Sequence, residues 1–133
     1  MIGTVVVTHG VIGTEMVRIA RSIVKEANPM VGVALEHDED MNVMSQKIRT
    51  AIQEVDRGGG MLLLTDLFGG TPANLCLALL EENHVEVITG VNLPMLIKLA
   101  SWKDAKPLHE VAEFIKSYGQ KNISRAGEIL KKQ

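Results

Sequence analysis

Short apolar runs alternate along the chain with longer segments in which apolar residues recur every three or four positions. Four of the short runs predict strands, at residues 3–8, 30–35, 61–65 and 85–89. The first consists almost entirely of Val and Thr, which is typical of a strand covered on both faces, as in a parallel sheet. We therefore expect these strands to form the middle layer of an α/β fold.

The longer segments have the periodicity of amphipathic helices. Between the first two strands, an apolar stripe extends over residues 12–24 with basic residues off the stripe. Asp40 is a typical capping residue and precedes a second stripe that ends at Val55. Further helices are predicted from about Thr71 to Glu82, after Asn92, and after Pro107 as far as Tyr118.

The β-α-β-α order requires right-handed crossovers, and it predicts an open, mainly parallel sheet with helices on both faces. We expect the strand order 2-1-3-4, in which the winding direction reverses between the first and third strands. Ligands of open α/β sheets bind at the carboxyl ends of the strands at such a reversal. His9-Gly10 and residues 66–72 follow those two strands and are the candidates for a site.

Composition narrows the classes of function. At 133 residues the chain has the size of one domain, and we expect residues 1–133 to form a single one. A net charge of −2 argues against a nucleic-acid surface. The single cysteine excludes an intramolecular disulfide, and neither a signal peptide nor an apolar run of roughly 20 residues is present. These features predict a soluble, cytoplasmic protein.

His9 and Asp66 form the first candidate pair. A neutral histidine has one free ring nitrogen that can act as a nucleophile, and a phosphohistidine needs its other nitrogen held as N–H. A carboxylate provides this hold and stabilises the developing cation. Asp66 follows the strand next to that of His9, about one strand spacing or ~5 Å away. A histidine at a strand end is more often structural, but the pairing favours a phosphoryl-accepting site.

The loop after the third strand is suited to an anion. Gly69-Gly70 can turn backbone amides toward a phosphate, and Thr71-Pro72 resembles a helix cap followed by a proline at the first helical position. A helix N-terminus is then directed at the same point, and the helix after Gly10 is expected to present a second one. Neither loop contains Arg or Lys, which predicts the loose phosphate binding of a carrier.

Some apolar residues near these loops suggest contact with a partner. Leu67-Phe68 lies at a loop tip, where apolar side chains reduce solubility unless another protein covers them. Met95, which follows Asn92, is expected at the rim of the site.

The remaining candidates have simpler interpretations. His37 lies in an acidic stretch without a partner at metal-ligand spacing, so we expect a solvated loop and no metal site. His84 is expected at a helix end and His109 in solvent, whereas Cys76 lies among leucines and is expected to be a buried hydrophobe. No pattern indicates a cofactor.

Three segments resemble the IIA component of the mannose-family phosphotransferase system. They read Val-Val-Thr-His-Gly, Leu-Leu-Leu-Thr-Asp-Leu-Phe-Gly-Gly-Thr-Pro-Ala-Asn and Ile-Thr-Gly-Val-Asn-Leu-Pro-Met-Leu, and the likeness extends over essentially the whole chain. It implies that His9 accepts a phosphoryl group from the phosphocarrier HPr and passes it to a histidine of a IIB component. Asp66 would be the paired carboxylate. The implied phosphate-binding and partner-binding residues are Gly10, Leu67, Phe68, Gly69, Gly70, Thr71, Asn92 and Met95.

The resemblance also implies a homodimer in which an antiparallel C-terminal edge strand, within residues 122–130, is exchanged between subunits. We expect a stand-alone IIA protein whose contact with the membrane components IIC and IID is only indirect. The sugar cannot be inferred, because a IIA domain does not contact it. A regulatory IIA whose phosphorylation state controls a partner is an alternative.

Two related folds are less consistent with the residues. A response-regulator receiver needs acidic residues after the first strand to bind magnesium, and that position reads Thr8-His9-Gly10. The phosphodonor subunit of dihydroxyacetone kinase lacks the Asp-Leu-Phe-Gly-Gly-Thr-Pro loop.

Overall fold

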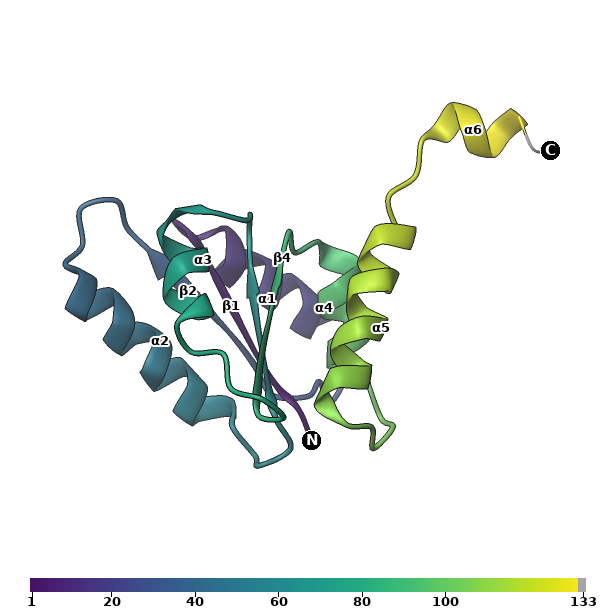
Figure 1. The fold of residues 1–133 in the computed structure, drawn as a ribbon. Helices are drawn as coiled ribbons and strands as arrows, with labels where there is room; N and C mark the ends of the chain where they lie inside the picture. Colours follow the sequence, from purple (N-terminus) through teal and green to yellow (C-terminus); the bar gives the residue numbers. More distant parts are fainter. Residues whose placement is uncertain (132–133) are drawn as a thin grey trace.

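A computed structural model describes residues 1–131 of the chain. Its four strands form one sheet in the order β2-β1-β3-β4, and all three pairings are parallel, which confirms the predicted topology (Figure 1). The strands are β1 (Gly3–His9), β2 (Met30–Leu35), β3 (Met61–Thr65) and β4 (Val85–Thr89). His9 is the last residue of β1 and pairs in register with Leu35 of β2. The candidate histidine thus lies at the carboxyl edge of the sheet.

Helices cover both faces of the sheet. The described residues form α1 (Ile12–Ile23), α2 (Met41–Val55), α3 (Gly70–Leu77), α4 (Leu93–Ala100), α5 (Leu108–Lys121) and α6 (Ala126–Lys131). In Figure 1, α2 and α3 lie on one side of the sheet, and α1, α4 and α5 lie on the other. Within residues 1–131, no helix combines the length and the apolar character that crossing a membrane requires.

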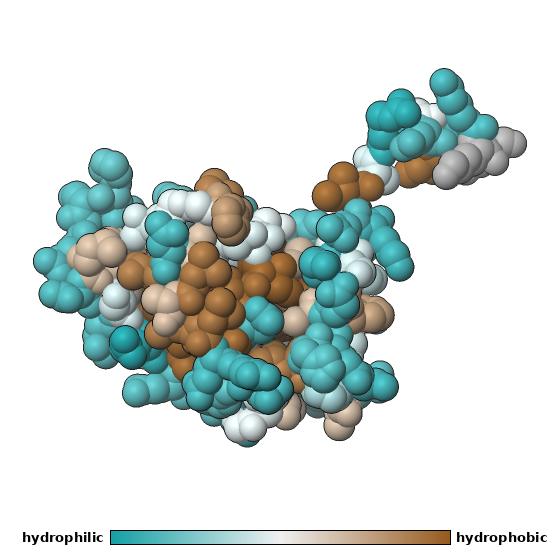
Figure 2. Space-filling model, viewed as in Figure 1, coloured by the Kyte–Doolittle hydropathy of each residue, from teal (hydrophilic) through white to brown (hydrophobic). Residues whose placement is uncertain are grey.

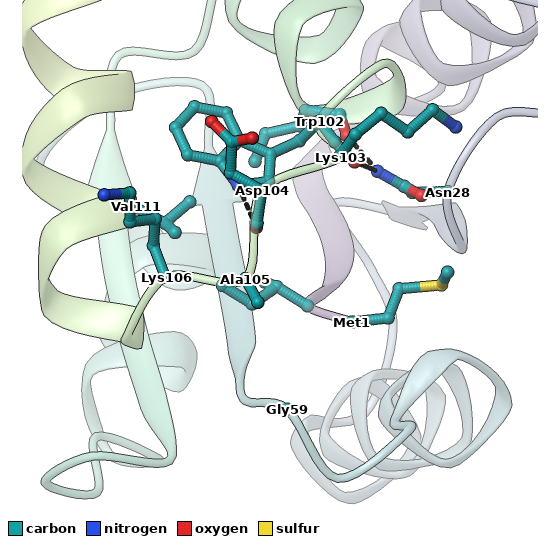
Figure 3. Close-up of a pocket in the computed structure, with 11 residues that line it drawn as sticks. Met1, Asn28, Gly59, Trp102, Lys103, Asp104, Ala105, Lys106 and Val111 are labelled. Carbon is teal, nitrogen blue, oxygen red and sulfur yellow. Dashed lines mark hydrogen bonds between the residues drawn. The ribbon is translucent and has the colours of Figure 1, made fainter.

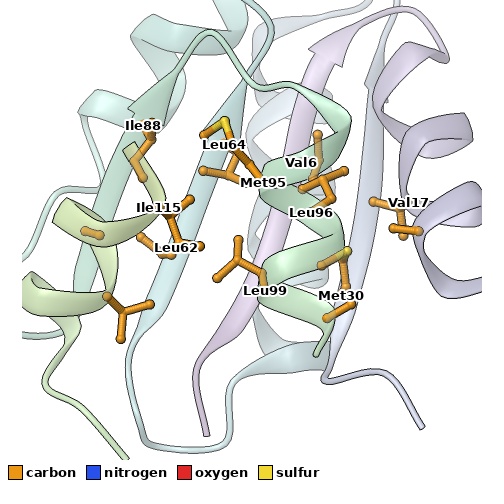
Figure 4. Packing of buried hydrophobic residues seen from close by; sticks show 14 of the residues in the cluster. Val6, Val17, Met30, Leu62, Leu64, Ile88, Met95, Leu96, Leu99 and Ile115 are labelled. Atoms are coloured by element: carbon orange, nitrogen blue, oxygen red, sulfur yellow. The ribbon is translucent and has the colours of Figure 1, made fainter. Parts of the chain in front are cut away.

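The core consists of two apolar layers separated by the sheet. Val6 packs with residues of α1, α4 and α5 on one face, as Figure 4 shows for part of this layer. Val5 and Val7 point the other way and pack with residues of α2 and α3. All three valines are fully buried, since alternate side chains of a strand point to opposite faces. Burial on both sides explains the uninterrupted apolar run in the sequence.

The helix α3 is shorter than predicted, because it ends at Leu77 rather than near Glu82. The backbone N–H of Glu81 donates to the carbonyl of Val85 at 3.1 Å, and that of Val85 donates to Glu81 at 2.8 Å. These bonds close a tight turn into β4, and Asn83 within it has a φ of 66°. A backbone engaged in the turn cannot also continue the helix.

The predicted C-terminal edge strand is not seen in the described residues. The structure forms α6 over Ala126–Lys131, and Figure 1 shows this helix beyond the end of α5 and away from the sheet. A strand needs the main chain of a neighbouring strand as its partner, and the segment lies away from the sheet of its own chain (Figure 1). Its backbone groups instead bond locally, as between the N–H of Glu128 and the carbonyl of Arg125 at 3.0 Å. No exchanged strand is formed by residues 122–130 as the structure describes them.

Candidate functional site

The side chain of Asp66 holds His9 through two hydrogen bonds to one oxygen. Asp66 Oδ2 lies 2.8 Å from His9 Nδ1 and accepts the backbone N–H of His9 at 3.0 Å. Its other oxygen, Oδ1, accepts the N–H of Leu67 at 3.1 Å. The Asp66 side chain is only 16% exposed, whereas 53% of the His9 side chain is open to solvent. The two residues at neighbouring strand ends therefore meet as predicted, and the imidazole is more exposed to solvent than the carboxylate.

This contact decides the tautomer of His9. Partial burial favours the neutral form of Asp66, but hydrogen bonds from the ring and the backbone of His9 outweigh it and lower the pKa of the carboxyl below its usual 3.8. An ionised carboxylate only accepts hydrogen bonds, so Nδ1 is the nitrogen that carries the proton. In the neutral imidazole, Nε2 consequently has a free lone pair on the exposed side of the ring.

A short turn fixes the backbone around His9. The hydroxyl of Thr8 accepts the N–H of Gly13 at 2.9 Å and donates to the carbonyl of Gly10 at 3.1 Å, which ties the start of α1 to the end of β1. Gly10 has a φ of 60°, a left-handed conformation that favours glycine. Its N–H donates to the carbonyl of Leu35 at 2.9 Å and extends the β1–β2 ladder past His9.

Gly70 packs directly against the imidazole. A Cβ atom at this position would lie 3.2 Å from Cε1 and 3.3 Å from Nε2 of His9, closer than nearly all such contacts. Gly70 also has a φ of 84°. It is the first residue of α3, so the free N–H groups at the start of this helix lie beside the nitrogen that has the lone pair. This arrangement suits a negatively charged group bound to Nε2.

The cap of α3 differs from the sequence-based prediction. Thr71 was expected to be the N-cap, but the cap lies two residues earlier, at Gly69, which has a φ of 89°. No side-chain hydrogen bond caps this end. The close approach to His9 and the positive φ both favour a glycine at position 70, the first residue of the helix. Thr71 consequently lies within the first turn.

A pocket of about 280 Å³ opens beside His9. Besides His9 it is lined by Gly10, Leu35, Glu36, His37, Met44, Thr71 and Pro72. His37 was expected in a solvated loop without a role, and the residue is indeed exposed. The strand register could have indicated that His37 lies near the site. Leu35 pairs with His9, so the loop after β2 starts next to His9.

Apolar side chains surround the exposed histidine. Leu67 and Phe68 are 49% and 77% exposed, as expected for a loop tip that a partner covers. Val11 and Ile12, at the start of α1, are 60% and 58% exposed and directly follow His9-Gly10. Neither residue was among the candidates predicted from the sequence. Their exposure extends the apolar surface to the other loop of the site.

Met95 is buried rather than placed at the rim of the site, and Asn92 caps a helix. Met95 was predicted at the rim of the site, but it is 2% exposed and belongs to the core layer of α4 and α5 (Figure 4). Asn92 caps α4 by accepting the N–H of Met95 at 3.3 Å, and its Nδ2 donates to the carbonyl of Gly119 at 3.0 Å. Neither residue lines the pocket beside His9. The reason is that the apolar stripe of α4 must face the core.

A larger cavity, of about 560 Å³, lies at the opposite edge of the sheet (Figure 3). Its lining includes Met1, Gly59 and the loop of residues 102–106, all near the amino ends of strands. Asn28 shapes it by donating from Nδ2 to the carbonyls of Leu99 and Trp102, at 2.9 and 2.6 Å. None of the predicted site residues lines this cavity, and the paired histidine and carboxylate are therefore the stronger indication of chemistry.

The other candidates carry little reactivity. Cys76 is buried as expected, and burial raises the pKa of its thiol to about 12. His84 lies 3.4 Å from Asp56, and His109 is exposed at the start of α5. Among residues 1–131, no group of three or more His, Cys, Asp or Glu side chains is placed to bind a metal ion.

Known proteins share both the fold and the sequence of this chain. The family model described as "PTS system fructose IIA component" (EIIA-man), where PTS denotes the phosphotransferase system, matches residues 3–116. The fructose-specific EIIA component of Bacillus subtilis is 26% identical over 133 residues, which cover 99% of this chain and 91% of that protein. The mannose-specific EIIAB component of Escherichia coli is 28% identical over 107 residues, 80% of this chain but only 33% of that protein.

Solved structures of other proteins are similar to this chain in fold. The PTS IIA protein associated with the fucose utilization operon of Streptococcus pneumoniae superposes with a TM-score of 0.83 at 26% identity, and it covers 97% of this chain and 96% of the other. The mannose/sorbose-specific IIA subunit of Enterococcus faecalis has a TM-score of 0.80 at 23% identity, with 92% of each chain covered, and shares the fold. The family match and the paired histidine and carboxylate lead to one conclusion: this chain belongs to the EIIA-man family of phosphotransferase-system IIA components, which are phosphotransferases.

Proposed function

We propose that this chain carries a phosphoryl group on Nε2 of His9, between a phosphohistidine donor and a second histidine acceptor. The observation that carries the proposal is the hydrogen bond of 2.8 Å between Asp66 and Nδ1, which leaves Nε2 as the nucleophile. The start of α3, with Gly70 against the ring, supplies free backbone N–H groups for the phosphoryl oxygens. The half-exposed ring is accessible to another protein.

The transfer conserves atoms and charge. The lone pair of Nε2 attacks phosphorus, the new N–P bond forms, and the N–P bond of the donor breaks with its electron pair returning to the donor ring. Nδ1 keeps its proton throughout, so the His9 ring becomes cationic while it is phosphorylated. Asp66 stabilises that cation and prevents the ring from rotating. Transfer to the acceptor follows the same steps in reverse.

The partners we infer are HPr as donor and a IIB component as acceptor, with transfer in the cytoplasm. The proposal rests on membership of the family and on the apolar surface of Val11, Ile12, Leu67 and Phe68. Apolar side chains at the centre of a contact exclude water, which keeps the transferred phosphoryl group from hydrolysis. Their position on both loops around His9 is suited to a partner that brings its own histidine to Nε2.

Incubation of the protein with phosphoenolpyruvate, enzyme I and HPr tests this assignment. The parent protein is expected to gain one acid-labile, base-stable phosphate, and His9→Ala is expected to gain none. His84→Ala serves as the matched control and should be labelled like the parent. His84 also contacts an aspartate, Asp56, but it lies at the amino end of β4, away from the carboxyl edge of the sheet that bears His9. If His9→Ala is labelled as well as the parent, another residue carries the phosphate.

We also propose that the chain associates as a homodimer. Figure 2 shows apolar side chains gathered over α3 and the segment that follows it, where Leu77 and Leu80 are 37% and 50% exposed beside the edge strand β4. The C-terminal segment extends away from the body and also exposes apolar residues, with Ile123 and Leu130 at 76% and 68%. A second copy could cover both surfaces at once.

Sedimentation of the full chain tests the homodimer. The parent is expected to sediment as a dimer, and the double change Ile123→Ser and Leu130→Ser is expected to shift it toward monomer. Ile23→Ser is the control, because Ile23 is 56% exposed but lies at the end of α1. A parent protein that is monomeric at all concentrations would rule out this association.

A further inference from the structure

We propose that His37 is the counter-charge for the phosphoryl group on His9. The inference rests on the proposed function, and it assigns to the site a residue on a third loop, after β2. His37 lines the same pocket of about 280 Å³ as His9. The strand register explains this placement, because β2 ends at Leu35 opposite His9 and Gly10 continues the ladder with a hydrogen bond of 2.9 Å to Leu35.

The charge balance of the pocket requires a cation. A phosphoryl group brings between one and two negative charges at neutral pH. The pocket lining already contains the carboxylate of Glu36, and Asp66 holds the ring from below. Of the residues that line the pocket, His37 is the one besides His9 whose side chain can become positively charged. Without it, a phosphorylated His9 would have only its own cationic ring and backbone N–H groups to balance the negative charge.

Hydrogen bonds of Glu39 and Asp40 build the loop that bears His37. Glu39 accepts the N–H of Glu36 at 2.7 Å and pairs with Lys47 Nζ, at 3.0 and 2.9 Å from its two oxygens. Asp40 caps α2 by accepting the N–H of Asn42 at 2.7 Å. These bonds hold both ends of the loop, so that Glu36 and His37 are presented to the pocket.

Apart from His9, Glu36 and His37, the residues that line the pocket carry no charge. Thr71 and Pro72 contribute to the lining from the first turn of α3, and Met44 of α2 adds an apolar side chain that is 6% exposed. A phosphoryl group in this pocket would thus lie among residues of α3 and of the loop that bears His37. The free N–H groups of the helix and the imidazolium of His37 act in the same direction, since both stabilise negative charge.

The test measures the equilibrium between phosphorylated HPr and the phosphorylated chain. His37→Gln removes the charge while keeping a polar side chain, and it is expected to shift the equilibrium toward HPr by about fivefold, the upper range for an exposed charge pair. His37→Lys restores a positive charge and should remain within about twofold of the parent. Glu36→Gln removes the repelling carboxylate and should shift the equilibrium the other way. His109→Gln changes an exposed histidine at the start of α5 and should match the parent.

Salt separates a charge effect from a structural one. The advantage of the parent over His37→Gln is expected to shrink when the ionic strength rises to about 0.5 M, because the screening length then falls below ~5 Å. A loss of packing would not depend on salt in this way. Equal thermal unfolding of the parent and the variant would exclude a folding defect.

Each outcome bears on the inference. A His37→Gln equilibrium equal to that of the parent would overturn the role of His37 and leave the proposed function of His9 intact. A His37→Lys variant as impaired as His37→Gln would also overturn it, since the shape and not the charge would then matter. If the parent accepts no phosphate from HPr, the proposed function and this inference both fail.

Discussion

Asp66 Oδ2 lies 3.0 Å from the backbone nitrogen of His9 and 2.8 Å from its Nδ1, so one carboxylate oxygen fixes both the position and the tautomer of the histidine. Asp66→Asn is expected to slow phosphoryl uptake from HPr by about 10- to 100-fold, by analogy with carboxylates that orient metal-binding histidines. The rate is measured by quenching the labelling reaction at a series of times. Asp56→Asn removes a carboxylate that contacts a different histidine, His84, and should label at the parent rate. An unchanged rate in Asp66→Asn would mean that the pairing is not needed for transfer.

The same carboxylate makes the stability of the protein depend on pH. The pKa of Asp66 is lower in the folded chain than its ordinary 3.8, so its contribution is fully present above about pH 4 and is lost as the pH falls through the lower folded value. Asp66→Asn lacks this contribution. We expect the difference in free energy of unfolding between parent and variant to be largest near pH ~5 and to shrink toward pH ~2. Denaturant unfolding across this range measures it, and a difference that does not change with pH would contradict the lowered pKa.

Gly70 offers a test of the close contact with the imidazole. In Gly70→Ala, the new methyl group would meet Nε2 at 3.3 Å and the backbone would have to keep a φ of 84°. We expect transfer to slow by about 10- to 100-fold, because the ring must move from its reactive position. Gly58→Ala is a matched control, since Gly58 has a φ of 85° and nothing lies within 4 Å of its added Cβ.

The control separates strain from contact. Both alanine variants are expected to lose about 1–2 kcal/mol of stability, the cost of a left-handed conformation for a residue with a Cβ atom. Only Gly70→Ala should also lose transfer activity. Equal transfer rates in the two variants would show that the contact between Gly70 and His9 does not affect phosphoryl transfer.

Phe68 tests the apolar surface around the site. Its side chain is 77% exposed, so Phe68→Ser should leave the unfolding temperature unchanged. We expect the KM for phosphorylated HPr to rise about three- to tenfold while kcat stays within twofold, because the side chain contacts the partner and not the reacting atoms. Ile23→Ser, also at an exposed apolar position, should change neither constant. A fall in kcat alone would place Phe68 in the chemistry instead.

The local sequence was sufficient to predict the sheet. Apolar runs such as Val5-Val6-Val7 are buried on both faces, and the right-handed connection between parallel strands restricts the order of the strands. The pairing of His9 with Asp66 was predictable for the same reason, since both residues end neighbouring strands. Asn92 was likewise recognisable before a helix, and it caps α4. These features follow from the residue pattern within short segments of the chain.

Other features depend on contacts between segments that are distant in sequence, and only the tertiary structure decided them. The helix α3 starts at Gly70, beside His9, and stops at Leu77, before the turn from Glu81 to Val85. Core packing buried Met95, and residues 126–131 formed a helix where no neighbouring strand was available. The register of β2 against β1 brought His37 to the pocket of His9. Local patterns specify which elements form, but the distances between side chains on separate elements follow from how those elements pack.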